Sequence, residues 1–174
     1  MLVDDTPEVH SQRARRFLES YRAHRSLNRA FYRQLPADKL DYRALDPSGR
    51  RVDSPRESLV HQLYVTRNYA YSVRTGVLRW GPDRESLLVI PATLTSFDKT
   101  RLLLELQRVE RELLDVLSEP DIETRLVDVP WAAEPIDALT LLERLNTHEV
   151  LHTSWNLELM QQLRIGRAPT GEAG

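Results

Sequence analysis

The segment LNTHEVLH, residues 145–152, is the most informative stretch of this 174-residue chain. Its two histidines, His148 and His152, are four residues apart, which places both imidazoles on one face of a helix, one turn apart. The helical pattern extends in both directions, because apolar or histidine side chains recur every three or four residues from Ala138 to Leu159. The segment therefore predicts a long helix that presents two side chains able to bind one metal ion.

The two histidines occupy positions in this stripe where leucine would otherwise be expected. A buried polar group without a hydrogen-bond partner costs about 1–3 kcal/mol, so each buried imidazole needs a partner. One interpretation is a metal ion shared by the pair. The other is a pair of core histidines bonded to tyrosine, asparagine or water, and the spacing alone leaves both interpretations open.

The clearest helix start in the chain is the tetrapeptide Ser54-Pro55-Arg56-Glu57. Ser54 suits the N-cap, proline suits the first helical position, and Glu57 can reach back to close a capping box. Gly76 is expected to end this helix, because glycine readily adopts the left-handed conformation of a helix C-cap.

Periodicity and capping signals together predict an all-α fold, a four-helix bundle within a single domain that spans residues 1–174. The third helix is expected to begin at Thr95 or Ser96, with Asp98 supporting its first turn. The expected helices span residues 11–35, 54–76, 95–119 and 135–165.

Long connections join these helices, so an antiparallel bundle is favoured but crossover connections are allowed. A short extended segment is expected within residues 122–131, and residues 87–90 suit either a strand or a buried loop. The ends of the chain, residues 1–10 and 167–174, are expected to be flexible tails.

Composition indicates an ordinary globular protein, with 41% hydrophobic residues, 29% charged residues and a net charge of −2. The absence of cysteine excludes disulfides and thiolate metal sites, so a metal site must use histidine, carboxylate or water. No apolar signal core or membrane-spanning run is present, so a cytoplasmic protein without a membrane partner is expected.

A row of arginines on the first helix raises the question of nucleic-acid binding. Arg22, Arg25, Arg29 and Arg33 share one face of that helix. The chain has no recognition motif and no net positive charge, so a solvated face is favoured and no nucleic-acid partner is expected.

A third histidine, His61, lies on the second expected helix, away from its main apolar stripe. We interpret it as a third ligand for the ion held by His148 and His152, and the alternative is an exposed or locally bonded histidine. Three neutral imidazoles bind a divalent transition ion and leave a coordination position open for water or substrate.

Glu149, Tyr64 and Asn68 are the candidate catalytic residues. A bound ion would lower the pKa of its water to about 7. Glu149 is rotated by roughly 100° from His148, so it would reach that water more easily than the ion itself. The same segment also spells HExxH, the zinc metalloprotease motif with glutamate as general base, but no histidine follows His152 to complete such a site.

Several short motifs follow one another in a characteristic order, namely LDYR at residues 40–43, Ser54-Pro55, His61, Thr75-Gly76 and His148-x-x-x-His152. In this order they resemble the DinB/YfiT-like superfamily of bacterial metal-binding four-helix proteins. The resemblance implies that the three histidines hold zinc, nickel or iron. It also implies a homodimer, a small-molecule substrate such as a thiol, and a link to stress responses.

The family is similar to thiol-dependent transferases and isomerases, but this chain departs from it after the last histidine. Family members often have a small residue and glutamine there, whereas this chain has Thr153-Ser154-Trp155, and Trp155 could fill space that a substrate needs. Three hypotheses follow. The first is a metal-dependent enzyme of transferase or hydrolase type that activates water or a low-molecular-weight thiol, and the second is a non-catalytic metal- or ligand-binding bundle. An HExxH zinc hydrolase is the third.

Overall fold

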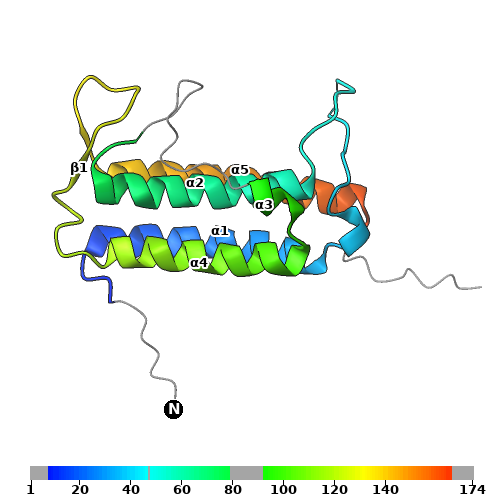
Figure 1. Cartoon of the computed structure of the whole chain (residues 1–174), viewed down its shortest axis with the longest axis horizontal. Coiled ribbons are helices and arrows are strands. Elements are labelled where there is room, and N and C mark those ends of the chain that lie inside the picture. Colours follow the sequence, from blue (N-terminus) through cyan, green and yellow to red (C-terminus); the bar gives the residue numbers. More distant parts are fainter. Residues whose placement is uncertain (1–7, 47, 79–91, 166–174) are drawn as a thin grey trace, which may run out of the picture.

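The computed structural model describes residues 8–46, 48–78 and 92–165, and four long helices form a bundle within these ranges (Figure 1). The long helices are α1 (Gln12–Gln34), α2 (Pro55–Thr75), α4 (Lys99–Leu117) and α5 (Ala138–Gln162). The shorter elements are the 3-10 helix η1 (Ala37–Lys39), the helix α3 (Ala92–Ser96) and the antiparallel strands β1 (Leu126–Val127) and β2 (Ile136–Asp137).

This architecture confirms the predicted all-α bundle, to which the two-stranded sheet is a small addition. Strand β1 lies within the expected extended segment 122–131, and β2 lies where the last helix was expected to begin. The segment 87–90 and most of the expected tails, 1–7 and 166–174, lie outside the described residues. Within the described ranges, no helix is both long and apolar enough to cross a lipid bilayer.

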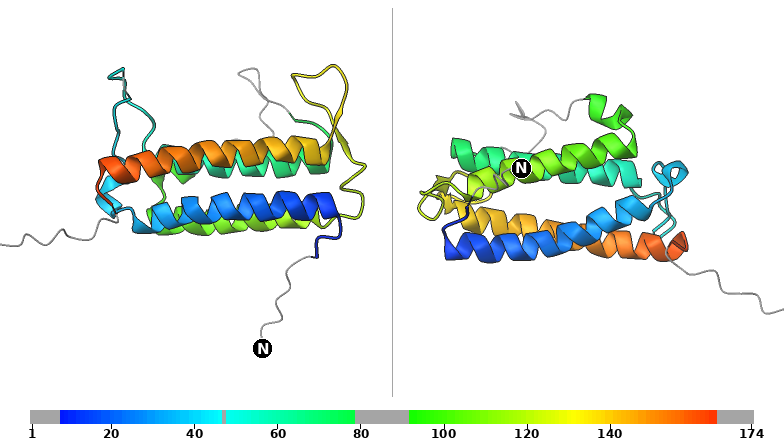
Figure 2. Two further views of the ribbon diagram at one scale, coloured as in Figure 1. Left: turned by 180° about the vertical axis from the view of Figure 1, so that it is seen from behind. Right: turned by 90° about the horizontal axis from the view of Figure 1, so that it is seen from below.

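The helices pack as two pairs, α1 with α5 and α2 with α4 (Figure 2). In Figure 1, α1 and α5 run in the same direction, and Arg13 near the start of α1 pairs with Asp137 and Glu143 at the start of α5. α2 and α4 also run in the same direction, since Arg56 at the start of α2 donates to the carbonyl oxygen of Phe97, which lies just before the start of α4. The α2–α4 connection is therefore a crossover, not the simple up-and-down order of an antiparallel bundle.

The predicted signals at both ends of α2 are confirmed. The backbone N–H of Glu57 donates to Ser54 Oγ at 3.3 Å, and the backbone N–H of Ser54 donates to the Glu57 carboxylate at 2.8 Å, which completes the capping box. Gly76 adopts a left-handed conformation with φ 75°, which a residue with a Cβ atom would adopt only under strain.

Two helices begin later than predicted. α4 begins at Lys99 and not near residue 95, because the Asp98 carboxylate accepts a hydrogen bond from the backbone N–H of Arg101 and so caps the helix. α5 begins at Ala138 and not near residue 135, because Asp137 is both its N-cap and part of β2. Periodicity locates the middle of a helix, whereas the local cap sets its first residue.

A layer of polar side chains divides the hydrophobic core into two parts. On α1 the layer separates Tyr21 of one apolar cluster from Phe31 of the other, and on α5 it separates Leu145 from Leu159. The buried members of this polar layer are Arg25, Asn28, Gln62, Thr66, Glu149, Thr153 and Asn156.

The prediction of a solvated arginine face on α1 is wrong for one of its four members. Arg22 and Arg33 are exposed and Arg29 is half-buried, but Arg25 is only 2% exposed. The buried stripe of α1 runs from Tyr21 through Arg25 to Asn28, at steps of four and three residues.

The capping box gives a first test of this fold. Replacing Ser54 by alanine removes the hydroxyl that accepts from the backbone N–H of Glu57, while the bond from the backbone N–H of residue 54 to Glu57 can remain, so the free energy of unfolding should fall by about 1 kcal/mol. The measurement is urea denaturation in the presence of a metal chelator. Ser26→Ala, at an exposed position inside α1, is the control and should change stability by less than about 0.5 kcal/mol. Equal effects of the two substitutions would contradict the assignment.

Candidate metal centre

Three histidine side chains from α2 and α5 converge at one point on the bundle. His148 Nε2 lies 2.9 Å from His61 Nε2 and 3.1 Å from His152 Nε2, and the ligand atoms of all three lie within 4.8 Å of one another. In a tetrahedral zinc site with Zn–N distances near 2.0–2.1 Å, the ligand nitrogens are separated by roughly 3.3 Å. The three rings are therefore close to the arrangement that one ion requires.

The structure brings together the three residues that the sequence singled out, although not in the surroundings expected. His61 is exposed, and its ring faces the other two. His148 and His152 were expected inside the buried stripe of α5, and this is wrong, because both are half-buried at its edge. The residues that enter the core at this level are Glu149 and Thr153.

Neighbouring side chains orient two of the rings. Ser58 Oγ lies 2.9 Å from His152 Nδ1, and the carboxylate oxygen Oε1 of Glu149 lies 3.8 Å from His148 Nδ1. An oxygen atom near Nδ1 in each ring can accept a hydrogen bond from that nitrogen when Nε2 binds an ion, as in many metal sites. Ser58 was missed by the sequence analysis, but its position three residues before His61 places both on one side of α2.

The electrostatic environment keeps two of the rings neutral. Burial, followed by the charge of nearby His148, lowers the pKa of His152 to about 3. Burial and His148 also lower the pKa of His61 below its usual value. Because metal coordination needs the unprotonated nitrogen, these two rings are ready to bind an ion at neutral pH without losing a proton.

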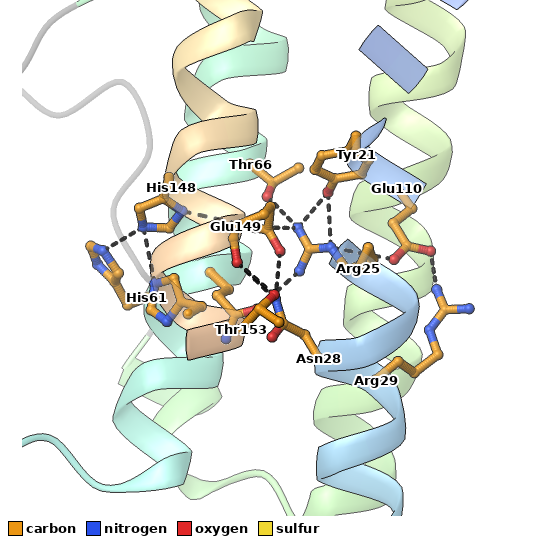
Figure 3. A network of polar contacts seen from close by, with 12 residues as sticks. Tyr21, Arg25, Asn28, Arg29, His61, Thr66, Glu110, His148, Glu149 and Thr153 are labelled. Atoms are coloured by element: carbon orange, nitrogen blue, oxygen red, sulfur yellow. Dashed lines mark hydrogen bonds and ion pairs between the residues drawn. The ribbon is translucent and has the colours of Figure 1, made fainter. Parts of the chain in front are cut away.

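Glu149 is fully buried and points into the bundle (Figure 3). Its carboxylate lies 3.0 Å from an Arg25 Nη2 atom and accepts a hydrogen bond from Asn28 Nδ2 at 3.0 Å. Burial by itself would raise the pKa of this carboxyl, but Arg25, His148 and Asn28 outweigh burial and hold the pKa below its usual range. Glu149 is therefore a carboxylate at neutral pH.

Arg25 has partners on every side of its guanidinium group. It donates to Tyr21 Oη on its own helix and to Thr66 Oγ1 of α2 at 2.7 Å. Its Nε atom lies 3.5 Å from the carboxylate of Glu110 on α4. Arg25 was not predicted from the sequence to belong to the site. The one signal that it faces the core was its position four residues after Tyr21 on the same helix.

A pocket of about 390 Å³ opens beside the three histidines. The described residues that line it are Val52, Asp53, Ser58, His61, His148, Leu151, His152 and Trp155. Trp155 is half-buried and contributes to the pocket lining without filling the pocket. The three histidines can therefore be reached from the pocket.

The three candidate catalytic residues, Glu149, Tyr64 and Asn68, are not among the described residues that line this pocket. Tyr64 packs against one of the apolar clusters, and Asn68 is buried. Their catalytic roles stay predictions. The position of Glu149 disfavours an HExxH hydrolase, since the general base of such an enzyme must reach a water molecule beside the ion.

A comparison with known families agrees with this arrangement. The family model of the DinB superfamily matches residues 20–155, which include all three histidines, and the chain belongs to this superfamily. No curated protein matches the chain significantly in sequence. Family and geometry together fit a metal-binding protein, as the sequence resemblance predicted.

The buried ion pair predicts a large and specific effect on stability. Replacing Arg25 by leucine leaves Glu149 as an unpaired buried charge, which should lower the free energy of unfolding by about 3–5 kcal/mol. The double substitution Arg25→Leu/Glu149→Leu should lose much less, because neither charge is then left alone.

Both variants are measured by urea denaturation with a chelator present. Arg22→Leu, which changes an exposed arginine on the same helix, is the control and should alter stability by less than about 0.5 kcal/mol. A single variant Arg25→Leu as stable as this control would show that the two charges are not paired in the core.

Proposed function

We propose that the protein is a metal-dependent enzyme of transferase or hydrolase type that activates water or a low-molecular-weight thiol. The observation that carries this proposal is the convergence of three histidine Nε2 atoms at the edge of an open pocket. Purely structural histidines have no need of such a pocket, whereas a reactive site must admit its substrate.

The residues around the pocket have distinct tasks in this proposal. His61, His148 and His152 would hold a divalent ion, and the ion would supply Lewis acidity that makes a water or thiol more acidic. Three protein ligands are typical of catalytic sites, which keep one position open, whereas structural zinc sites usually use four. Zinc, nickel and iron all suit imidazole ligands.

A carboxylate on the pocket wall suits the proton-transfer task. Asp53 lines the pocket, precedes the N-cap of α2, and interacts electrostatically with His61. Asp53 is therefore placed to accept a proton from a substrate in the pocket. From the sequence, this role was expected of Glu149, which is buried. The apolar side chains Val52, Leu151 and Trp155 would contact the rest of the substrate and limit its access to water.

The test begins with metal content and continues with turnover. Protein purified without a metal-affinity tag should hold close to one ion per chain, and zinc at a hundredfold excess over its dissociation constant should stabilise it by about 2.7 kcal/mol. The metal-loaded protein is then assayed with a panel of low-molecular-weight thiols and a chromogenic electrophile, and with nitrophenyl esters as substrates for water. Turnover is expected with one of these.

His152→Ala should abolish both the stabilisation by zinc and the turnover. His10→Ala, which removes an exposed histidine outside the site, is the matched control and should change neither. Asp53→Asn should reduce turnover while leaving zinc binding intact. Less than about 0.2 ion per chain together with no thermal stabilisation would overturn the proposal, since a ligand that binds only the native state must stabilise it.

A second function, metal or ligand binding without turnover, is favoured by one observation. Trp155 forms part of the pocket wall, where its large ring takes up space that a substrate could use. One ion per chain, lost in His152→Ala, without turnover of any thiol or ester, would support this binding function. The homodimer and the link to stress responses implied by the resemblance stay predictions under either function.

A further inference from the structure

We propose that Glu149 is a positioning residue that fixes the orientation and tautomer of His148, and that Arg25 anchors Glu149 from across the bundle. This inference rests on the metal site of the proposed function. It assigns the glutamate of the HExxH segment a different task from that of a general base, because the residue acts through His148 and does not touch the substrate.

The first step of the argument concerns two buried atoms that face each other. Nδ1 of His148 and Oε1 of Glu149 are both inaccessible to solvent, and neither forms a hydrogen bond of normal geometry within the described part of the chain. They lie 3.8 Å apart, an electrostatic contact longer than a hydrogen bond, and Oε1 is the oxygen that lies 3.0 Å from Arg25. The negative charge beside Nδ1 favours a proton on that nitrogen, which leaves the lone pair on Nε2, the atom that faces the other two histidines.

The second step concerns what holds the carboxylate in place. Arg25 and Asn28, both from α1, contact Glu149 at 3.0 Å. Arg25 is in turn fixed by Thr66 of α2 and by Glu110 of α4. Figure 3 shows this chain of contacts crossing the bundle from His148 to Glu110. Each of the four long helices therefore contributes to the position of one imidazole ring.

The third step concerns the cost of the arrangement. Well-packed apolar residues in place of a buried ion pair often leave a protein as stable or make it more stable, so stability alone does not account for charges in this core. The polar layer is adjacent to the histidines in sequence, because Glu149 follows His148 and Gln62 follows His61. A role in orienting the site accounts for this coincidence.

The experiment compares zinc affinities by competition with a chromophoric chelator. Glu149→Gln keeps an oxygen near Nδ1 but removes the negative charge, and zinc affinity should fall about 10- to 100-fold, as when the partner of a metal-binding histidine is altered. The double variant Arg25→Gln/Glu149→Gln leaves no unpaired charge in the core, and it should show the same loss if the single variant does not fold. Glu110→Gln should show a smaller loss.

Glu112→Gln is the matched control. Glu112 lies on the same helix as Glu110 and pairs with Arg67, outside the polar layer. Its substitution should leave zinc affinity unchanged. Wild-type affinity in Glu149→Gln, or an equal loss in Glu112→Gln, would overturn the inference.

A second readout does not depend on metal binding. In metal-free wild-type protein, ¹⁵N NMR of the histidine rings should show the His148 proton on Nδ1, and Glu149→Gln or the double variant should change this tautomer population. A proton mainly on Nε2 in the wild type would overturn the inference. If the wild type binds no zinc, the proposed function fails, and this tautomer measurement still decides the role of Glu149.

Discussion

The buried contact between Arg25 and Glu149 is the constraint on which the arrangement of the bundle depends. Each charge would be costly in the core without partners, so the surrounding helices must supply polar groups at the same level. This requirement accounts for the polar layer that divides the apolar core into two clusters. Because Glu149 is fixed in the interior, the neighbouring His148 is held at the edge of the bundle, where it meets His61 and His152.

Much of the fold could be predicted from local sequence signals. The capping box at Ser54 and the glycine at position 76 bound α2 correctly, because their hydrogen bonds and backbone conformation involve only nearby residues. The starts of α4 and α5 were placed too early, because Thr95, Ser96 and Pro135 also suit a helix start, whereas Asp98 and Asp137 are the residues that cap the two helices. The crossover between α2 and α4 depends on contacts between distant segments, so the sequence pattern could only allow for it.

The site could also be predicted only where it depends on local sequence. A four-residue spacing places His148 and His152 together within one helix, but nothing local connects them to His61, and the family resemblance supplied that link. Spacing also could not decide which side of α5 faces the core, and a rotation of about 100° separates His148 from Glu149. Glu149 was therefore expected near the ion, and the two histidines in the core. The structure shows the reverse arrangement, with Glu149 buried against Arg25 of α1 and the histidines half-buried at the edge.

The most direct test of the histidine site is an anomalous-scattering map from crystals grown with zinc. We expect a peak at about 2.0–2.1 Å from the Nε2 atoms of His61, His148 and His152, with Nδ1 of His148 still facing the Glu149 carboxylate. A map without a peak between these rings, at a zinc concentration that occupies other sites on the protein, would contradict it.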